Sequence, residues 1–161
     1  MLINYLIVFF ISMVPIIELR GAIPFATIMG LDPVWSYIIC IVGNMLPVPI
    51  IYLFARKVLL WGKDKKYIGK FFTFCIEKGE KGGEKLKAKA GKGLFIALML
   101  FVGIPLPGTG AWTGTLAASF LNMGFKKSII AVMLGVLIAG IIMALASMGL
   151  LGGLSAIFAP H

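Results

Sequence analysis

Long uncharged apolar runs dominate the chain and set the first expectations about its fold. Residues 34–55 contain no charged side chain, and residues 128–151 form a second run of the same kind. At about 1.5 Å of rise per residue, helices of these lengths cross a hydrocarbon core of about 30 Å. We therefore expect both runs to be membrane-spanning helices.

Each expected span is preceded by a longer apolar stretch that is interrupted in its middle. Residues 1–31 carry two charges there, Glu18 and Arg20, and residues 93–125 carry none but contain Ile-Pro-Leu-Pro-Gly-Thr-Gly at 104–110. Proline and glycine favour the end of a helix. A single helix over the second stretch would be about 50 Å long. We therefore predict, in both stretches, two helical arms around a break, which form a re-entrant hairpin.

The basic residues lie mostly in one segment. Twelve of the fifteen Lys and Arg residues fall between Arg56 and Lys92, and the net charge is +9. Basic loops beside apolar spans stay on the cytoplasmic side and attract anionic headgroups. A nucleic-acid patch is disfavoured because no base-reading module is present. If residues 93–125 enter and leave by one face, Lys126 and Lys127 return to the cytoplasmic side too.

Together these patterns predict an all-α integral membrane fold built from two inverted repeats in a single membrane domain, residues 1–161. Residues 1–55 and 93–161 are the repeats, each a re-entrant hairpin followed by a transmembrane helix, and residues 56–92 are a basic cytoplasmic amphipathic linker. Within the linker, residues 67–76 predict a short helix on the membrane surface and residues 78–92 a solvated loop or frayed helix. Both termini are expected outside the cytoplasm.

Composition supports this class and narrows the chemistry. The chain is 60% hydrophobic and 13% charged, with a mean hydropathy of +1.04, whereas soluble domains are about 45–50% apolar and about 25% charged. The sequence contains no metal-ligand cluster, nucleophile elbow or phosphate-binding P-loop. We therefore expect no enzyme activity and no cofactor, and we expect residence in the cytoplasmic membrane.

The acidic and basic residues of the first hairpin are the leading functional candidates. A charged side chain at membrane depth costs at least about 2.5–3.5 kcal/mol, so Glu18 and Arg20 need partners or a task. One interpretation is a structural ion pair between them. The other is that Arg20 holds an anionic group while Glu18 accepts a proton or binds a cation.

The second break supplies complementary groups. Backbone N–H groups at 108–110 and the start of the following helix favour an anion, while Thr109, Thr113 and the Trp112 indole add polar contacts. Close packing of small residues is the alternative interpretation. Asn44, beside prolines in residues 43–49, either satisfies carbonyls freed by a kink or touches substrate. The candidate substrate-binding residues are Glu18, Arg20, Pro24, Asn44, Pro107, Gly108, Thr109, Gly110, Trp112 and Thr113.

Residues 18–24, 43–49 and 104–114 resemble three signature segments of the small multidrug export protein family, and the likeness runs over nearly the whole chain. More distantly, the plan is similar to the DedA (VTT-domain) family. That resemblance implies inverted re-entrant hairpins that move phospholipids or polyprenyl phosphates, with Glu18 and Arg20 as the embedded pair. The family's second arginine is missing here, because residues 93–125 carry no charge.

These features predict a homodimeric transporter that moves an amphiphilic anion, such as a polyprenyl phosphate or a phospholipid, coupled to protons or cations. Its partners are membrane lipids, with anionic headgroups at the linker. One alternative is efflux of small cationic drugs, with Glu18 as the counter-charge. Another is a membrane phosphatase acting on a polyprenyl pyrophosphate, for which the chain has few acid and base groups. The last is a scaffold or insertion factor.

Overall fold

The computed structural model describes residues 2–65, 67, 69–90 and 93–158, and within these ranges all regular secondary structure is helical. The expected all-α class is confirmed. In chain order the helices are α1 (Leu2–Met13), α2 (Glu18–Ile28), α3 (Pro33–Met45), α4 (Val48–Ile50), the π-helical turn η1 (Ile51–Ala55), α5 (Arg56–Gly62), α6 (Gly69–Ala90), α7 (Leu94–Gly103), α8 (Ala111–Phe120) and α9 (Phe125–Phe158).

Helices α1 and α2 form an antiparallel hairpin, but its break lies earlier than predicted. The turn occupies residues 14–17, so Glu18 and Arg20 belong to the first turn of α2 rather than to an unwound segment. Pro15 explains this position, because the residue before a proline is driven out of the helical region. Pro24 does not break the chain and lies inside α2. The carbonyl that it leaves without a donor belongs to Arg20, at the very start of the helix.

Among the residues that the structure describes, two segments are long and apolar enough to cross a membrane, Pro33–Phe54 and Phe125–Gly149. They correspond to the two spans expected from the sequence. The first begins where the Asp32 side chain accepts hydrogen bonds from the backbone of Val34 and Trp35, each at 3.0 Å. It bends after Met45 and continues through α4 and η1, since Pro47 and Pro49 remove two backbone donors.

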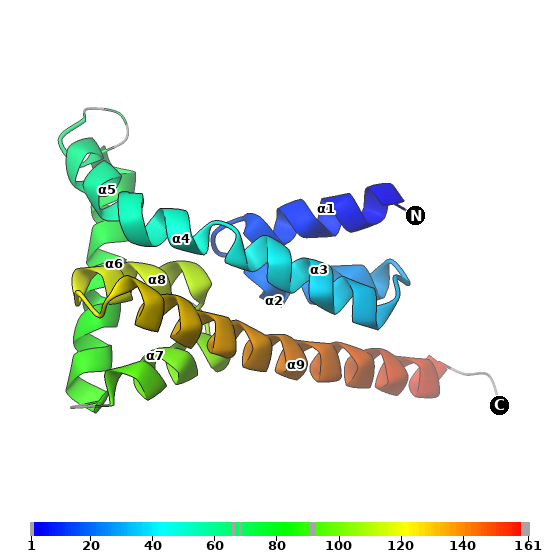
Figure 1. The fold of residues 1–161 in the computed structure, drawn as a ribbon. Coiled ribbons are helices and arrows are strands. Elements are labelled where there is room, and N and C mark those ends of the chain that lie inside the picture. Colours follow the sequence, from blue (N-terminus) through cyan, green and yellow to red (C-terminus); the bar gives the residue numbers. More distant parts are fainter. Residues whose placement is uncertain (1, 66, 68, 91–92, 159–161) are drawn as a thin grey trace.

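Helix α6 corrects the prediction for the second part of the linker. It runs unbroken to Ala90, across one end of the molecule and at a steep angle to α9 (Figure 1). Of the two alternatives predicted for residues 78–92, the loop is therefore wrong and the helix is correct as far as Ala90, and residues 91–92 lie outside the described part. Lys, Glu and Ala favour a helix. In addition, α6 packs closely against the end of α8, since a Cβ on Gly83 would lie 3.4 Å from the side chain of Leu121, the residue that follows α8.

The two hairpins are placed at opposite ends of the long helices. The α1–α2 hairpin opens toward the end where α1 starts and α9 finishes, whereas the α7–α8 hairpin opens toward α6 (Figure 1). The break between α7 and α8 covers residues 104–110, as predicted.

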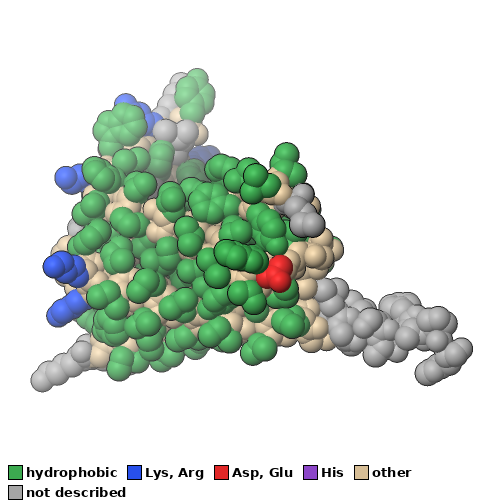
Figure 2. Space-filling view, turned by 45° about the vertical axis from the view of Figure 1, so that its right-hand side comes forward, with side chains coloured by type: hydrophobic (Ala, Val, Ile, Leu, Met, Phe, Trp, Pro, Cys, Tyr) green, Lys and Arg blue, Asp and Glu red, His purple; other side chains and the backbone are tan. Residues whose placement is uncertain are grey.

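Small and β-branched side chains fill the space between the hairpins and the long helices. Ala22, Ala26, Ala117 and Val132 belong to one fully buried cluster, which brings helices close together. The outer surface is largely apolar: Figure 2 shows hydrophobic side chains over most of one face, with Lys and Arg gathered at the edge on the side of α6. Such a surface suits lipid rather than water.

Candidate functional site

The start of α2 meets the start of α8 through the Glu18 carboxylate. Oε2 accepts a hydrogen bond from the backbone N–H of Ala111 at 3.2 Å, and Oε1 accepts one from Trp112 at 3.1 Å. Glu18 is only 5% exposed. The first N–H groups of a helix have no partner within it and carry its positive dipole end. The buried carboxylate therefore accepts hydrogen bonds from the first N–H groups of α8, and the N-terminus of α8 stabilises the negative charge of Glu18.

Gly110 allows this close contact. A Cβ at this position would lie 2.8 Å from Glu18 Oε1 and 2.9 Å from its carboxylate carbon. Gly110 is buried directly before the first residue of α8. Any larger residue would push the carboxylate away from the N–H groups, so the glycine is required by space.

Arg20 binds the other side of the same break. Its guanidinium donates to the carbonyl of Leu106, to the carbonyl of Ile104 at 3.3 Å and to that of Val102 at 3.4 Å, and also to Thr109 Oγ1 at 3.0 Å. These carbonyls lie at the end of α7 and in the following turn, where helix carbonyls lose their partners and the dipole is negative. The negative Glu18 thus lies at the positive start of α8, and the positive Arg20 lies at the negative end of α7.

Two further contacts fasten the hairpin tips. The Thr109 hydroxyl lies 3.0 Å from the carbonyl of Ile104 and 2.9 Å from that of Leu106, which closes the turn. The indole N–H of Trp112 donates to the carbonyl of Met13, the last residue of α1, at 3.2 Å. The predicted candidates Glu18, Arg20, Thr109, Gly110 and Trp112 therefore lie together at the meeting point of the hairpins.

The predicted ion pair takes a different form. Glu18 and Arg20 each hydrogen-bond to the second hairpin, the carboxylate to N–H groups and the guanidinium to carbonyls. The two side chains attract each other electrostatically, and each also faces peptide dipoles, because the break in the second hairpin exposes donors to Glu18 and acceptors to Arg20. We call this arrangement of Glu18, Arg20 and residues 104–112 the tip interlock.

Asn44 lies apart from these hydrogen bonds. It is fully buried in α3, and within the described part of the chain neither of its amide atoms has a hydrogen-bond partner. The interpretation that Asn44 satisfies carbonyls freed by the kink is therefore wrong. Pro24, one more candidate, is half-buried in α2, and its backbone nitrogen has no hydrogen to donate. A buried amide without partners is costly, which makes Asn44 a residue to test.

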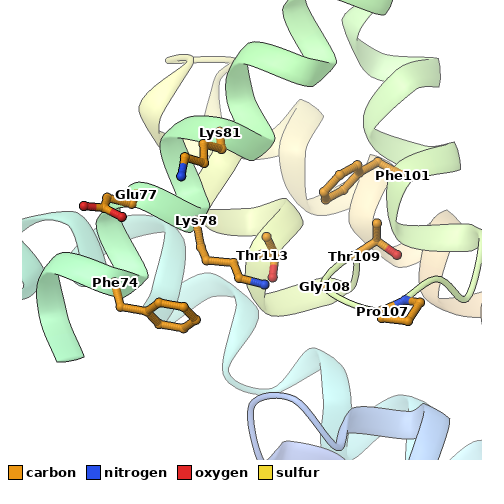
Figure 3. A pocket seen from close by; sticks show the side chains of 9 residues that line it. All are labelled: Phe74, Glu77, Lys78, Lys81, Phe101, Pro107, Gly108, Thr109 and Thr113. Atoms are coloured by element: carbon orange, nitrogen blue, oxygen red, sulfur yellow. The ribbon is translucent and has the colours of Figure 1, made fainter. Parts of the chain in front are cut away.

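Pro107, Gly108, Thr109 and Thr113 also border a cleft on the side of α6. The cleft has a volume of about 240 Å³ and its remaining lining comes from Phe74, Glu77, Lys78, Lys81 and Phe101 (Figure 3). Within this α6 cleft the Lys78 side chain points toward the turn, and its Nζ lies 3.1 Å from the place that a Cβ on Gly108 would take.

Sequence reasoning did not single out Lys78 and Lys81, because it treated the basic residues of 56–92 only as a topology signal and as a general attraction for anionic headgroups. Their position depends on α6 crossing beside the second hairpin, which no local pattern shows. Among the residues that the structure describes, no group of three or more His, Cys, Asp or Glu side chains is arranged to hold a metal ion.

Residues 18–142 match the family described as "Putative small multi-drug export protein". The match begins at Glu18, directly after the turn of the first hairpin, and includes the tip of the second hairpin, α6 and about half of α9. The chain belongs to this family. It is accordingly a membrane protein of the small multidrug export type, in agreement with its two apolar spans. No curated protein and no solved structure gives a significant match to the chain.

Proposed function

We propose that this small multidrug export protein is a transporter for amphiphilic anions, in which the tip interlock is the closed gate. The observation that carries the proposal is the position of the Glu18 carboxylate, which accepts hydrogen bonds from two backbone N–H groups at the start of α8. A helix N-terminus of this kind binds phosphate and carboxylate groups. Glu18 therefore occupies a place where the anionic group of a cargo can bind.

Proton coupling follows from the same contact. A protonated Glu18 loses the charge that attracts the α8 N-terminus, so the carboxyl group can leave and a cargo anion can take its place. When the proton is released, the carboxylate returns and displaces the cargo. Exchange at one site in this way links the movement of an anion to the movement of a proton.

Arg20 has a positioning role in this scheme. By donating to the carbonyls of residues 102–106, the guanidinium holds the end of α7 and the turn in a fixed place beside α8. Its fork of donors suits several carbonyls at once, which a lysine ammonium cannot match. Without Arg20 the turn would keep only its internal Thr109 hydrogen bonds and would lose its side-chain contacts to α2.

The membrane orientation belongs to the proposal as well. With the basic α6 on the cytoplasmic side, the α7–α8 hairpin is re-entrant from the cytoplasm and the α1–α2 hairpin from outside, so the halves are inverted repeats. Both termini then lie outside, and residues 1–161 work as one membrane domain without enzyme activity.

A homodimer completes the proposed transporter. Two spans and two hairpins are few for enclosing a polar path, and Arg20 is only half-buried within one chain. A second copy would cover the open side of the tips. Mass measurement of the purified protein, corrected for detergent, tests this part separately.

The central experiment measures movement of a fluorescent phosphatidylglycerol between the leaflets of proteoliposomes. We expect Glu18→Gln to abolish the effect of a proton gradient on this movement, whereas Asp32→Asn, which removes a carboxylate outside the tips, leaves it intact. Arg20→Ala should abolish movement altogether. Full gradient-dependent movement in both Glu18→Gln and Arg20→Ala would refute the proposal.

Efflux of cationic drugs is the second candidate, and one contact favours it. The Glu18 carboxylate lies against the backbone of Trp112, whose indole can hold a cation once the carboxylate is free. In that case Glu18→Gln removes resistance to ethidium in cells and leaves phosphatidylglycerol movement unchanged. The two assays in the same variant therefore separate the candidates.

A further inference from the structure

We propose that the α6 cleft binds the phosphate headgroup of an anionic membrane lipid. The cleft shares Pro107, Gly108 and Thr109 with the tip interlock, but neither Glu18 nor Arg20 lines it. The assignment goes beyond the proposed transport function, because the cleft can hold a lipid whether or not that lipid is carried across.

Two lysine side chains supply positive charge to the cleft. Lys78 and Lys81 are three positions apart on α6, so both extend from the same side of the helix. Lys78 reaches the turn itself, since its Nζ lies 3.1 Å from the place of a Cβ on Gly108 (Figure 3). Gly108 has a φ of +80°, a conformation that glycine adopts without strain and that turns the chain sharply around the ammonium group.

A neutral donor completes a set of groups suited to phosphate. The Thr113 side chain lines the cleft, whereas the hydroxyl hydrogen of Thr109 is already directed at the carbonyls of Ile104 and Leu106. Phosphate oxygens accept hydrogen bonds from ammonium and hydroxyl groups together, and the charged bonds are the stronger ones. The cleft therefore offers two cations and the Thr113 hydroxyl within about 240 Å³.

One acidic side chain also lines the cleft, and its position limits its effect. The Glu77 carboxylate points away from Lys78 (Figure 3). It borders a neighbouring cleft as well, of about 410 Å³, where Lys63, Lys65 and Lys70 surround it. Counting both clefts, lysines outnumber the single glutamate, so the end of the molecule at α6 attracts anions.

The apolar part of the lining identifies a lipid as the ligand rather than a free anion. Phe74, Phe101 and Pro107 stand beside the polar groups. Phe71 and Phe74 are exposed on α6, and Trp61 is exposed on the preceding helix. Aromatic side chains with lysine neighbours lie at the headgroup level of a membrane. At this depth a lipid presents its phosphate to the cleft and its acyl chains to the aromatic rings.

Native mass spectrometry of the detergent-purified protein tests the proposal, with dioleoylphosphatidylglycerol as the probe. We expect the double variant Lys78→Gln/Lys81→Gln to bind this lipid about tenfold more weakly, the order of magnitude for losing one charge-assisted hydrogen bond. The matched control is Lys126→Gln/Lys127→Gln, which removes the same charge from exposed lysines at the start of α9. It should bind as the unmodified protein does, and Lys78→Arg/Lys81→Arg should retain most of the affinity.

An equal loss in the glutamine variant and its matched control would overturn the proposal, because binding would then depend on net charge alone. Complete displacement of the lipid by millimolar inorganic phosphate would also overturn it, since the site would then recognise a free anion. Dioleoylphosphatidylcholine, which carries no net charge, should bind more weakly than phosphatidylglycerol.

A labelling experiment locates the site without altering the lysines. In a background with Cys40→Ala and Cys75→Ser, Thr113→Cys should react with a maleimide, and phosphatidylglycerol should slow the reaction. Lys126→Cys in the same background should react at an unchanged rate. Lack of protection at position 113 would place the lipid elsewhere. Neither measurement requires transport, so failure of the proposed function and failure of the headgroup site give different results.

Discussion

The Glu18 carboxylate caps the helix that begins at Ala111, 93 positions further along the chain. This contact joins the two halves of the molecule through one side chain and the backbone of the opposite hairpin. Since the carboxylate is buried and both oxygens are engaged, the first testable consequences concern stability as much as transport.

Replacing Glu18 by glutamine should destabilise the protein by about 1–3 kcal/mol, because the amide keeps one acceptor and its NH₂ group faces a backbone donor. Thermal unfolding in detergent, followed by tryptophan fluorescence, measures the change. Asp32→Asn is the matched comparison: Asp32 caps α3 from an exposed position, and asparagine is an equally good cap. Equal melting temperatures for the two variants would mean that the Glu18 contact adds no stability.

Gly110→Ala should be strongly destabilising, because the new methyl group would overlap the Glu18 carboxylate. The three atoms nearest to that methyl all belong to Glu18, so the effect should depend on that side chain. In a Glu18→Ala background the same glycine substitution should cost much less. A double-mutant cycle from unfolding data gives the coupling, and strictly additive effects would show that the two positions do not interact.

Arg20→Lys should lose function although it keeps the charge. A lysine ammonium cannot reach the carbonyls of Val102, Ile104 and Leu106 with the planar geometry that the guanidinium provides. We expect transport in this variant to fall by tenfold or more, of the order of one lost charge-assisted bond. Transport rate and folded yield should be measured together, and wild-type transport would show that only the charge matters.

Asn44→Leu should leave the protein as stable or make it more stable by about 1 kcal/mol, because a buried amide without partners is replaced by an apolar side chain of similar size. The melting temperature provides the measurement. If transport falls in this more stable variant, Asn44 contacts the cargo. A large drop in stability would instead reveal hydrogen bonds to Asn44 that form in the membrane.

The side of the membrane on which each segment lies can be tested by cysteine labelling in whole cells. With Cys40 and Cys75 replaced, cysteines at Lys63 and Lys126 should both be protected from an impermeant maleimide, whereas one at Asp32 should react. This pattern follows if the α7–α8 hairpin returns to the side of α6. Labelling of position 126 but not 63 would require α7 and α8 to cross the membrane.

The sequence predicted the parts of the fold that depend on local chemistry. The two uncharged spans and the break at residues 104–110 follow from hydropathy and from the prolines and glycines there. The break of the first hairpin was predicted a few residues too late, at the charged pair, whereas Pro15 ends the first helix before Glu18. Beyond Lys78 the sequence left a loop and a frayed helix as alternatives, since the support of α6 there comes from contacts with α8 rather than from an apolar stripe.

The candidate site could be predicted as a set of residues but not as an arrangement. Charges at membrane depth and a break rich in glycine mark Glu18, Arg20 and Gly110 as unusual in any reading of the sequence. Which group each charge meets depends on two hairpins that pack across long sequence distances. For this reason the pairing of Glu18 with the N–H groups of α8, and of Lys78 with the turn at Gly108, required the structure.

The turn at 104–110 contacts both Arg20 and the α6 cleft. Arg20 donates to Thr109 and to carbonyls of this turn, and the Lys78 ammonium lies close to Gly108. Coupling between two binding events is reciprocal. If a bound lipid favours one position of this turn, it changes the free energy of the Arg20 contacts by the same amount by which those contacts change the affinity for the lipid. Lipid binding in the α6 cleft and the protonation of Glu18 in the other hairpin would then influence one another through the seven residues of this turn.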